Sequence, residues 1–246
     1  LDTTGSAKTA GPLQAHVVLK APDLAPLAAA GGVDLQGHTN LTVDAAQQGD
    51  TTSVTLNGTL GVTGGMAPVP ALIGPDAKID LAASMTGQDI RVTRLAVNGK
   101  TLDVTAQGAL ADKKLDADWT VALSDLGAVQ PSLEGQLEAK GHAAGPMDDL
   151  AVQADLTGQV SGQGYKSGAL TAHVDASGLP GAPKAQVTAQ GTLLDSPLDV
   201  ALAASRQPDG QMHLTIDRLS WKTAQAQGAL ALAPNDACYV PLGHRQ

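Results

Sequence analysis

Histidines are the side chains here with the widest range of chemistry, because they act as general bases and metal ligands near neutral pH. The chain contains His16, His38, His142, His173, His213 and His244. Their spacing matches no metal-ligand pattern, and four of them occupy polar positions in stretches where apolar and polar residues alternate. We therefore expect histidines on a solvated surface, and we predict no metal site.

Paired carboxylates and glycine-rich loops are the other groups whose spacing could serve a reaction. Asp116 with Asp118, and Asp148 with Asp149, could form acid–base pairs. The first pair lies on the wet side of a predicted strand and the second in a predicted turn, so both are expected to be solvated. Segment 162–168 (GQGYKSG) resembles a phosphate loop, but a strand pattern follows it where a helix is required. We predict that the chain is not an enzyme and uses no cofactor.

A short motif with glycine recurs seven times: a polar or small residue, Gly, any residue, then Leu or Val. In six copies the residue two positions before the Gly is apolar, which places the Gly on the same strand face as the Leu or Val. Glycine inside a strand marks a bend, a bulge or a close approach. The motif therefore predicts positions where a sheet curls, although a sequence rich in Gly and Ala could also place Gly there often. The glycines are Gly58, Gly108, Gly135, Gly158, Gly168, Gly191 and Gly228.

The elements that carry these glycines are predicted to be strands, since strict alternation of apolar and polar residues dominates the chain, as in 102–110 and 115–123. One-sided alternation is typical of antiparallel sheets with one dry face and one wet face. A dry face that no helix covers must close on itself or cover an apolar ligand, and acyl chains or an apolar strand are the candidates for a groove along it. Its predicted residues are Leu102, Val104, Leu110, Trp119, Val121, Leu123, Leu137, Val152, Leu156, Val174, Val187, Leu193, Val200, Leu202 and Leu214.

Turn signals and longer repeats suggest how the strands are organised. Asn98-Gly99 predicts a two-residue hairpin turn that sets Leu95 opposite Leu102. Arg94-Leu95 leads to AQGAL at 106–110, and Arg218-Leu219 leads to AQGAL at 226–230. We therefore predict two related halves, 1–124 and 125–234, followed by an irregular tail at 235–246.

Composition limits the classes of function. The chain of 246 residues has no Phe, two Trp and two Tyr, so Ala, Leu and Val must supply most of the packing, which suits a thin, elongated body. The net charge of −9 without a basic patch argues against nucleic-acid binding. The single cysteine, Cys238, excludes an internal disulfide. No apolar run approaches the roughly 20 residues of a membrane span. Because the first residue is Leu1, we interpret the chain as a fragment and expect any membrane anchor outside it.

Three features together resemble the TamB family of translocation and assembly modules, which are AsmA-like bridge-type lipid transfer proteins. These are Asp23-Leu24-Ala25-Pro26-Leu27 before an alternating strand, the recurring G-x-L on the dry face, and the Arg-Leu strand that leads to AQGAL. The resemblance covers about residues 10–234. It implies an elongated, curved and mostly antiparallel sheet, folded into a U-shaped (β-taco-like) trough with an apolar interior and one or two short helices.

The resemblance also implies a place and a role. The full-length protein would be anchored in the inner membrane of a Gram-negative bacterium and would cross the periplasm. It would take part in phospholipid transfer toward the outer membrane, in the assembly of outer-membrane proteins such as autotransporters with an Omp85-type partner, or in both. Two other readings of the residues stay open: a secreted adhesin or autotransporter passenger with a parallel β-solenoid, and a β-sandwich interaction domain whose two sheets cover each other.

Overall fold

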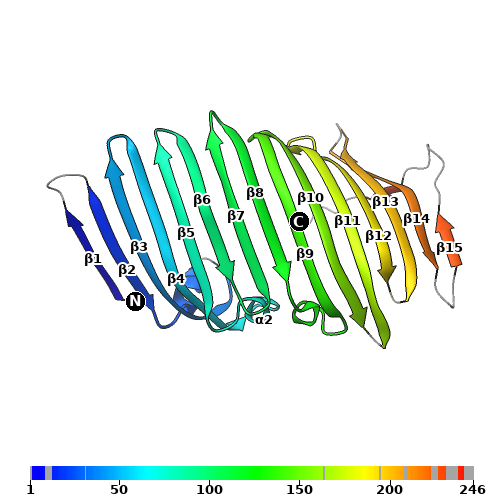
Figure 1. Ribbon diagram of the computed structural model, residues 1–246, viewed down its shortest axis with the longest axis horizontal. Helices are drawn as coiled ribbons and strands as arrows, with labels where there is room; N and C mark the ends of the chain where they lie inside the picture. The colour runs from blue at the N-terminus through cyan, green and yellow to red at the C-terminus, as the bar shows by residue number, and fades with distance from the viewer. Residues whose placement is uncertain are drawn as a thin grey trace. The chain divides into compact units, whose positions relative to one another are not determined.

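The computed structural model describes residues 2–8, 13–30, 32–162, 164–193, 195–207, 210–222, 227–230 and 238–240 (Figure 1). The fold is all-β with almost no helix, as the alternation predicted. The strands are β1 (Asp2–Lys8), β2 (Gln14–Ala21), β3 (Leu35–Gln48), β4 (Thr51–Gly65), β5 (Ala77–Thr86), β6 (Asp89–Asn98), β7 (Leu102–Ala111), β8 (Lys114–Leu123), β9 (Glu134–Pro146), β10 (Asp149–Gly162), β11 (Tyr165–Pro180), β12 (Lys184–Leu193), β13 (Ser196–Arg206), β14 (Met212–Lys222), β15 (Gln227–Leu230) and β16 (Cys238–Val240).

The chain divides into two compact units. The first comprises Leu1–Asp112 and Ala117–Pro131, and the second comprises Lys113–Asp116 and Ser132–Gln246. Strands β1 to β7 of the first unit pair in chain order, as do β9 to β15 of the second, and β16 pairs with β14. The pairs whose register is described, such as β3 with β4 and β10 with β11, are antiparallel. This arrangement confirms the predicted antiparallel sheet and contradicts the parallel β-solenoid.

Three short helical segments belong to the first unit. They are α1 (Ala25–Ala30), α2 (Val69–Ile73) and the 3-10 helix η1 (Leu126–Ala128). At the starts of α1 and η1 an aspartate binds the backbone just after it: Asp23 Oδ1 accepts from the Ala25 N–H at 2.9 Å, and Asp125 Oδ1 accepts from the Gly127 N–H at 2.8 Å. These bonds satisfy amides that a helix start leaves free. Helix α2 was not predicted; Pro70 lies inside it and Pro68 directly precedes it.

The predicted turn at Asn98-Gly99 is wrong in length and register. Residue Asn98 pairs with Asp103, which leaves a longer connection, and Leu95 lies opposite Ala106 and not opposite Leu102. The connection is widened because it docks on α2: the Lys100 N–H donates to the Ile73 carbonyl at 2.9 Å, and the Thr101 N–H donates to the Leu72 carbonyl at 3.1 Å. A tertiary contact therefore overrides the local turn preference.

One strand pair in each unit contains a β-bulge just before an arginine. In β5–β6 the register shifts between Ala82, opposite Arg94, and the next residue. In β13–β14 it shifts between Ala201, opposite Arg218, and the next residue. These arginines are those of the repeated Arg-Leu motif. The extra residue of a bulge increases local twist, so the two matching sequence segments also share a local distortion.

Candidate functional site

Apolar residues of the first unit form continuous rows across its strands on one side of the sheet, which we name the apolar face. One row runs through Leu19, Leu41, Gly58, Ile79, Val97 and Val104. The next row runs through Val17, Val43, Leu56, Leu81, Leu95 and Ala106. Of the predicted groove residues, Val104 and Leu110 lie in such rows, and Leu102 shares their phase on β7. Trp119, Val121 and Leu123 share one phase of β8.

The second unit has an apolar face of the same construction. One row runs through Gly141, Ala154, Val174, Val187, Leu202 and Ile216. Another runs through Leu137, Gly158, Leu170, Gly191 and Leu198. The rows beside them contain Leu156 with Val200, and Val152 with Leu214. Leu193 pairs with Ser196, but its side chain lies outside the described residues. The register therefore brings the predicted groove residues of this unit into adjacent rows.

The two faces are half-buried and do not form a packed core. Every predicted groove residue whose side chain is described is partly buried, neither fully covered nor fully exposed. Among the described residues the fully buried apolar side chains are few, and Val62 is the largest of them. The inner faces of a sandwich are packed as densely as other protein interiors. The burial pattern therefore fits a single layer of sheet in each unit.

Sequence reasoning missed the contribution of the first strands to this face. Residues such as Val17, Leu41 and Leu81 belong to its rows, yet the predicted groove began only at Leu102. The alternation of apolar and polar residues in 13–19 and 54–62 indicated that these segments also have an apolar side. What the sequence could not supply was the register that joins these residues to Val97 and Val104.

Six of the predicted sheet-curling glycines lie on the apolar faces, where each is opposite a larger apolar residue of a neighbouring strand. Gly58 pairs with Leu41, Gly108 with Val92, Gly135 and Gly168 with Val160, Gly158 with Leu137, and Gly191 with Leu170. Gly168 belongs to this set although its motif copy lacked the apolar residue two positions before it. Gly228 pairs with Trp221, whose side chain lies outside the described residues.

Close backbone approach explains why glycine is needed at two of these positions. A Cβ on Gly158 would collide with the backbone oxygen of Gln136, and a Cβ on Gly168 would collide with that of Thr192. Any side chain would push the neighbouring strands apart. That these glycines curl the sheet stays a prediction, while the steric need for glycine is part of the structure.

The two ends of the first unit's apolar face differ. At the capped end, defined by Ala21, Val62 and Ala77, side chains are only 1 to 2% exposed. Here the Leu24 N–H donates to the Gly37 carbonyl at 2.8 Å, and the Val62 N–H donates to the Gly74 carbonyl at 2.7 Å, so the segments around α1 and α2 are fastened to β3 and β4. At the open end, defined by Met85 and Ile90 in the β5–β6 hairpin, exposure is 47 and 41%.

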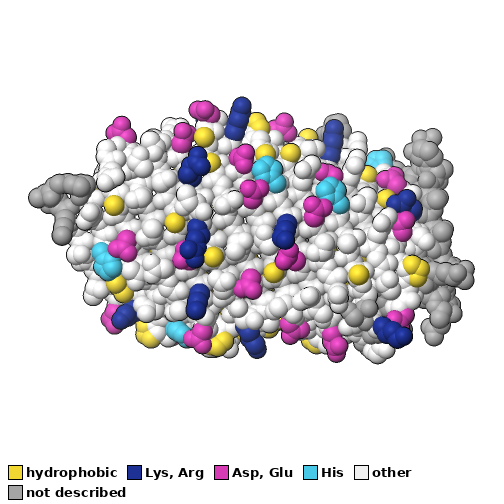
Figure 2. Space-filling model, viewed as in Figure 1, with side chains coloured by type: hydrophobic (Ala, Val, Ile, Leu, Met, Phe, Trp, Pro, Cys, Tyr) yellow, Lys and Arg dark blue, Asp and Glu magenta, His cyan; other side chains and the backbone are white. Residues whose placement is uncertain are grey.

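The opposite side of the strands, the polar face, carries charges of both signs (Figure 2). Arg94 Nε lies 3.2 Å from Asp80 Oδ1, and Arg218 Nε lies 2.9 Å from Asp199 Oδ2. Each arginine is thus paired with an aspartate of the strand before it, directly beside the bulge of its own strand pair. These side chains are more than a third exposed, so each pair contributes little to stability.

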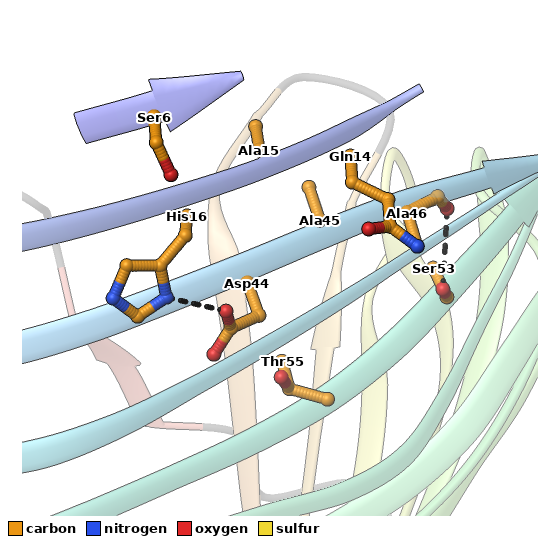
Figure 3. Close-up of a pocket in the computed structure, with 9 residues that line it drawn as sticks. All are labelled: Ser6, Gln14, Ala15, His16, Asp44, Ala45, Ala46, Ser53 and Thr55. Carbon is orange, nitrogen blue, oxygen red and sulfur yellow. Dashed lines mark hydrogen bonds and ion pairs between the residues drawn. The ribbon is translucent and has the colours of Figure 1, made fainter. Parts of the chain in front are cut away.

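The structure pairs His16 and His173 with carboxylates, which the sequence did not predict. His16 Nδ1 lies 2.6 Å from Asp44 Oδ1 across β2 and β3, at the floor of a shallow hollow that also contains Ser53 and Thr55 (Figure 3). His173 lies between two carboxylates, with Nδ1 2.6 Å from Asp155 Oδ1 and Nε2 2.9 Å from Asp175 Oδ2. Its hydrogen bond to Asp155, together with the charges of both carboxylates, raises the pKa of His173, and desolvation opposes the rise.

Both histidines are about half exposed, with side-chain exposures of 50% for His16 and 46% for His173. The described residues also contain no group of three or more side chains suited to hold a metal ion. None of their helices has the length and hydrophobicity required to span a membrane. The chain matches none of the protein-family models, curated proteins or solved structures with which it was compared.

Proposed function

We propose that this chain is a periplasmic segment of a TamB-like, inner-membrane-anchored protein, and that its apolar faces hold phospholipid acyl chains during transfer between the inner and outer membranes. The observation that carries the proposal is the continuity of the apolar rows, which cross strand after strand in each unit and stay half-buried. A large apolar surface that the protein itself leaves uncovered commonly marks a site for another apolar molecule.

The proposed mechanism is passive and needs no catalytic residue, cofactor or covalent step. Acyl chains would lie on the apolar face while the headgroups stay in water. Each buried methylene contributes about 0.8 kcal/mol, so an acyl chain would be held. Neighbouring strands lie about 4.8 Å apart and present similar apolar side chains, so the chain could slide between equivalent positions over low barriers. Each strand would then be one step of a track.

The trough shape is a further part of the proposal. In the second unit, glycine alternates with leucine along the row from Leu137 to Leu198. Small residues at regular intervals on the concave side would let the sheet curl without collisions between side chains. A U-shaped trough with an apolar interior would shield acyl chains from water better than a flat sheet. In outer-membrane protein assembly with an Omp85-type partner, an apolar strand of the protein being assembled would lie in the same apolar interior.

Native mass spectrometry of the protein, expressed in a Gram-negative host and purified without detergent, tests the proposal. Bound phospholipid is expected on the wild-type chain. Val187→Asp places a charge within an apolar row, so we expect the folded variant to lose bound lipid. Thr188→Asp is the matched control, because Thr188 is the exposed neighbour of Val187 on the polar face, lies opposite His173 and Ala201, and its substitution should leave lipid unchanged.

Val121→Asp provides the same test on β8 in the first unit. Circular dichroism and thermal melting establish that each variant is folded. Wild-type protein that carries no phospholipid would favour the plain interaction domain instead, and undiminished lipid on folded Val187→Asp would show that lipid binds elsewhere.

A further inference from the structure

The apolar face of the first unit reaches the open end in a row of large side chains that face water. Met85 of β5 lies opposite Ile90 of β6, and Ile90 lies opposite Leu110 of β7. Leu13 lies at the same end, just before β2, where its carbonyl accepts from the Gln47 N–H at 2.8 Å. Met85, Ile90 and Leu13 are 47, 41 and 49% exposed, and we name these three residues the apolar rim. An apolar molecule that moves onto the face at this end meets apolar side chains from the start.

The capped end of the same face is closed by the chain itself. Ala21, Thr39, Leu60 and Ala77 form the last row there, across β2 to β5. Ala21, Thr39 and Ala77 are 1, 7 and 1% exposed. The Thr39 hydroxyl donates to the Thr59 carbonyl at 2.9 Å, which satisfies this buried polar group. Helix α2 lies at this end of the strands (Figure 1). A molecule on the face could leave here only by displacing these segments.

The distance between the two ends matches the length of an acyl chain. Ile79, next to the capped row, and Met85, in the rim, lie on the same side of β5. A strand rises about 3.4 Å per residue, so these two residues are about 20 Å apart along β5. The acyl chains of one bilayer leaflet fill half of a hydrocarbon core roughly 30 Å thick, which is about 15 Å. An acyl chain that lies parallel to the strands therefore fits between the capped row and the rim, over Leu81 and Ala83.

A phospholipid fits this floor better in one direction than in the other. Its headgroup carries charges that lose their hydration if they are buried without partners. At the open end the headgroup would lie beside exposed residues such as Thr86 and Asp89 of the β5–β6 hairpin. At the capped end it would lie against Ala77 and Val62, which are only 1 and 2% exposed. The methyl end of an acyl chain has no polar group, so it suits the capped end.

We propose that the first unit binds acyl chains in one orientation: the chain enters across the apolar rim and lies parallel to the strands, with its methyl end at the capped end and its headgroup outside the rim. This inference rests on the proposed function and adds the direction of the ligand and its point of entry. Met85 and Ile90 are then entry residues, and Ile79 lies near the methyl end. The helical segments act as a stop that sets how far a chain can enter.

Photo-crosslinking with two lipid probes tests the orientation. Both probes are phosphatidylcholines, and they differ only in the position of a diazirine, which lies next to the ester in one and at the methyl end of the acyl chain in the other. The purified protein takes up each probe from phosphatidylcholine vesicles, is separated from them and is irradiated. Trypsin cleaves after Lys78 and Arg91, so Ile79 and Met85 lie in one peptide whose fragmentation reads both positions. We expect the ester-side probe to label near Met85 and Ile90, and the methyl-end probe to label near Ile79.

The outcomes distinguish a failure of this inference from a failure of the proposed function. Labels in the reverse order, or the same distribution for both probes, would overturn the orientation while acyl chains still bind the apolar face. Labels from both probes only on polar-face residues such as Ser84 would overturn the proposed function for this unit, and the orientation with it. A protein that takes up neither probe would have the same consequence.

A substitution in the rim tests the point of entry. Met85→Asp places a charge where the acyl chain must cross, so the lipid-free protein should take up phosphatidylcholine from vesicles more slowly, on the order of tenfold. Ser84→Asp is the matched control, because Ser84 lies on the polar face, opposite Ser53 and Arg91, and its substitution should leave the rate unchanged. Native mass spectrometry at timed intervals measures the bound lipid. Equal rates for the two folded variants would show that acyl chains do not enter across the rim.

Discussion

The capped end and the open end of the first unit's apolar face are built from the same strands but differ in what covers them. Val62 and Ala77 at the capped end are 2 and 1% exposed, while Met85 at the other end of β5 is 47% exposed. Along β5 alone, burial therefore falls from nearly complete to about half. The lesson is that the helical segments, and not the sheet, create the small core of this unit. Among the described residues, the rest of the face stays partly exposed.

The largest difference between the two ends should be in folding stability. Val62→Asp would bury a charge without a partner, and we expect a loss of about 4 kcal/mol or more in the free energy of unfolding. Met85→Asp at the open end should cost less than about 0.5 kcal/mol, because the new carboxylate remains in water. Urea unfolding measures both. If Val62→Asp does not fold, Val62→Ala should still cost about 2 kcal/mol, and equal costs at Val62 and Met85 would contradict the comparison.

Substitution of a glycine tests whether neighbouring strands of the second unit's apolar face are held at a fixed separation. Gly158→Ala should cost about 1 to 3 kcal/mol, since the new methyl group would collide with the backbone of β9. Gly181 is the matched control, because a Cβ there would lie 4.0 Å from the nearest atom, the Asp148 carbonyl oxygen. Thermal unfolding of both alanine variants measures the difference. A stable Gly158→Ala variant would show that the strands can separate at this row without cost.

The hydroxyl that fastens α2 to the capped end should have a smaller effect. Thr101 is buried, and its Oγ1 donates to the Ala71 carbonyl at 3.1 Å. Thr101→Val should cost about 1 kcal/mol, because it leaves that carbonyl without its partner. Thr93→Val removes a similar 3.1 Å bond, to the Ala82 carbonyl, at an exposed bulge where water can replace it. Equal losses for the two variants in chemical denaturation would mean that burial at the capped end does not strengthen this contact.

The smallest expected effect is a pH dependence on the polar face. The pKa of His173 is raised in the folded protein, so its contribution to stability is fully present below its unfolded value, near 6.5, and is lost as the pH rises through the folded value. The midpoint of thermal unfolding should therefore decline slightly from pH 6 to pH 8.5 for this reason. His173→Gln should flatten that part of the profile. Asp155→Asn should do so partly, because it removes the strongest cause of the shift. An unchanged slope in His173→Gln would assign the pH dependence to other groups.

The sequence predicted the strands and their faces well, because alternation reports directly which side of a strand is dry. It also singled out Asp23-Leu24, and the Asp23 carboxylate accepts from the Ala25 amide at the start of α1. It could not predict the pairing of His16 with Asp44 or of His173 with Asp155, because 28 and 18 residues separate these partners and only the strand register joins them. The turn at Asn98 failed for a related reason: α2, which lies earlier in the chain, determines its shape.

Pairing of each strand with its neighbour in sequence has a consequence for how such a protein forms. Because each strand contacts chiefly its neighbours in sequence, strand pairing needs no crossover between distant parts of the chain, which favours faster folding than in β folds with long crossovers. Stability should then accumulate hairpin by hairpin, as in a repeat array. A chain of this kind can lengthen or shorten in evolution by whole hairpins, since no distant strand has to find a new partner.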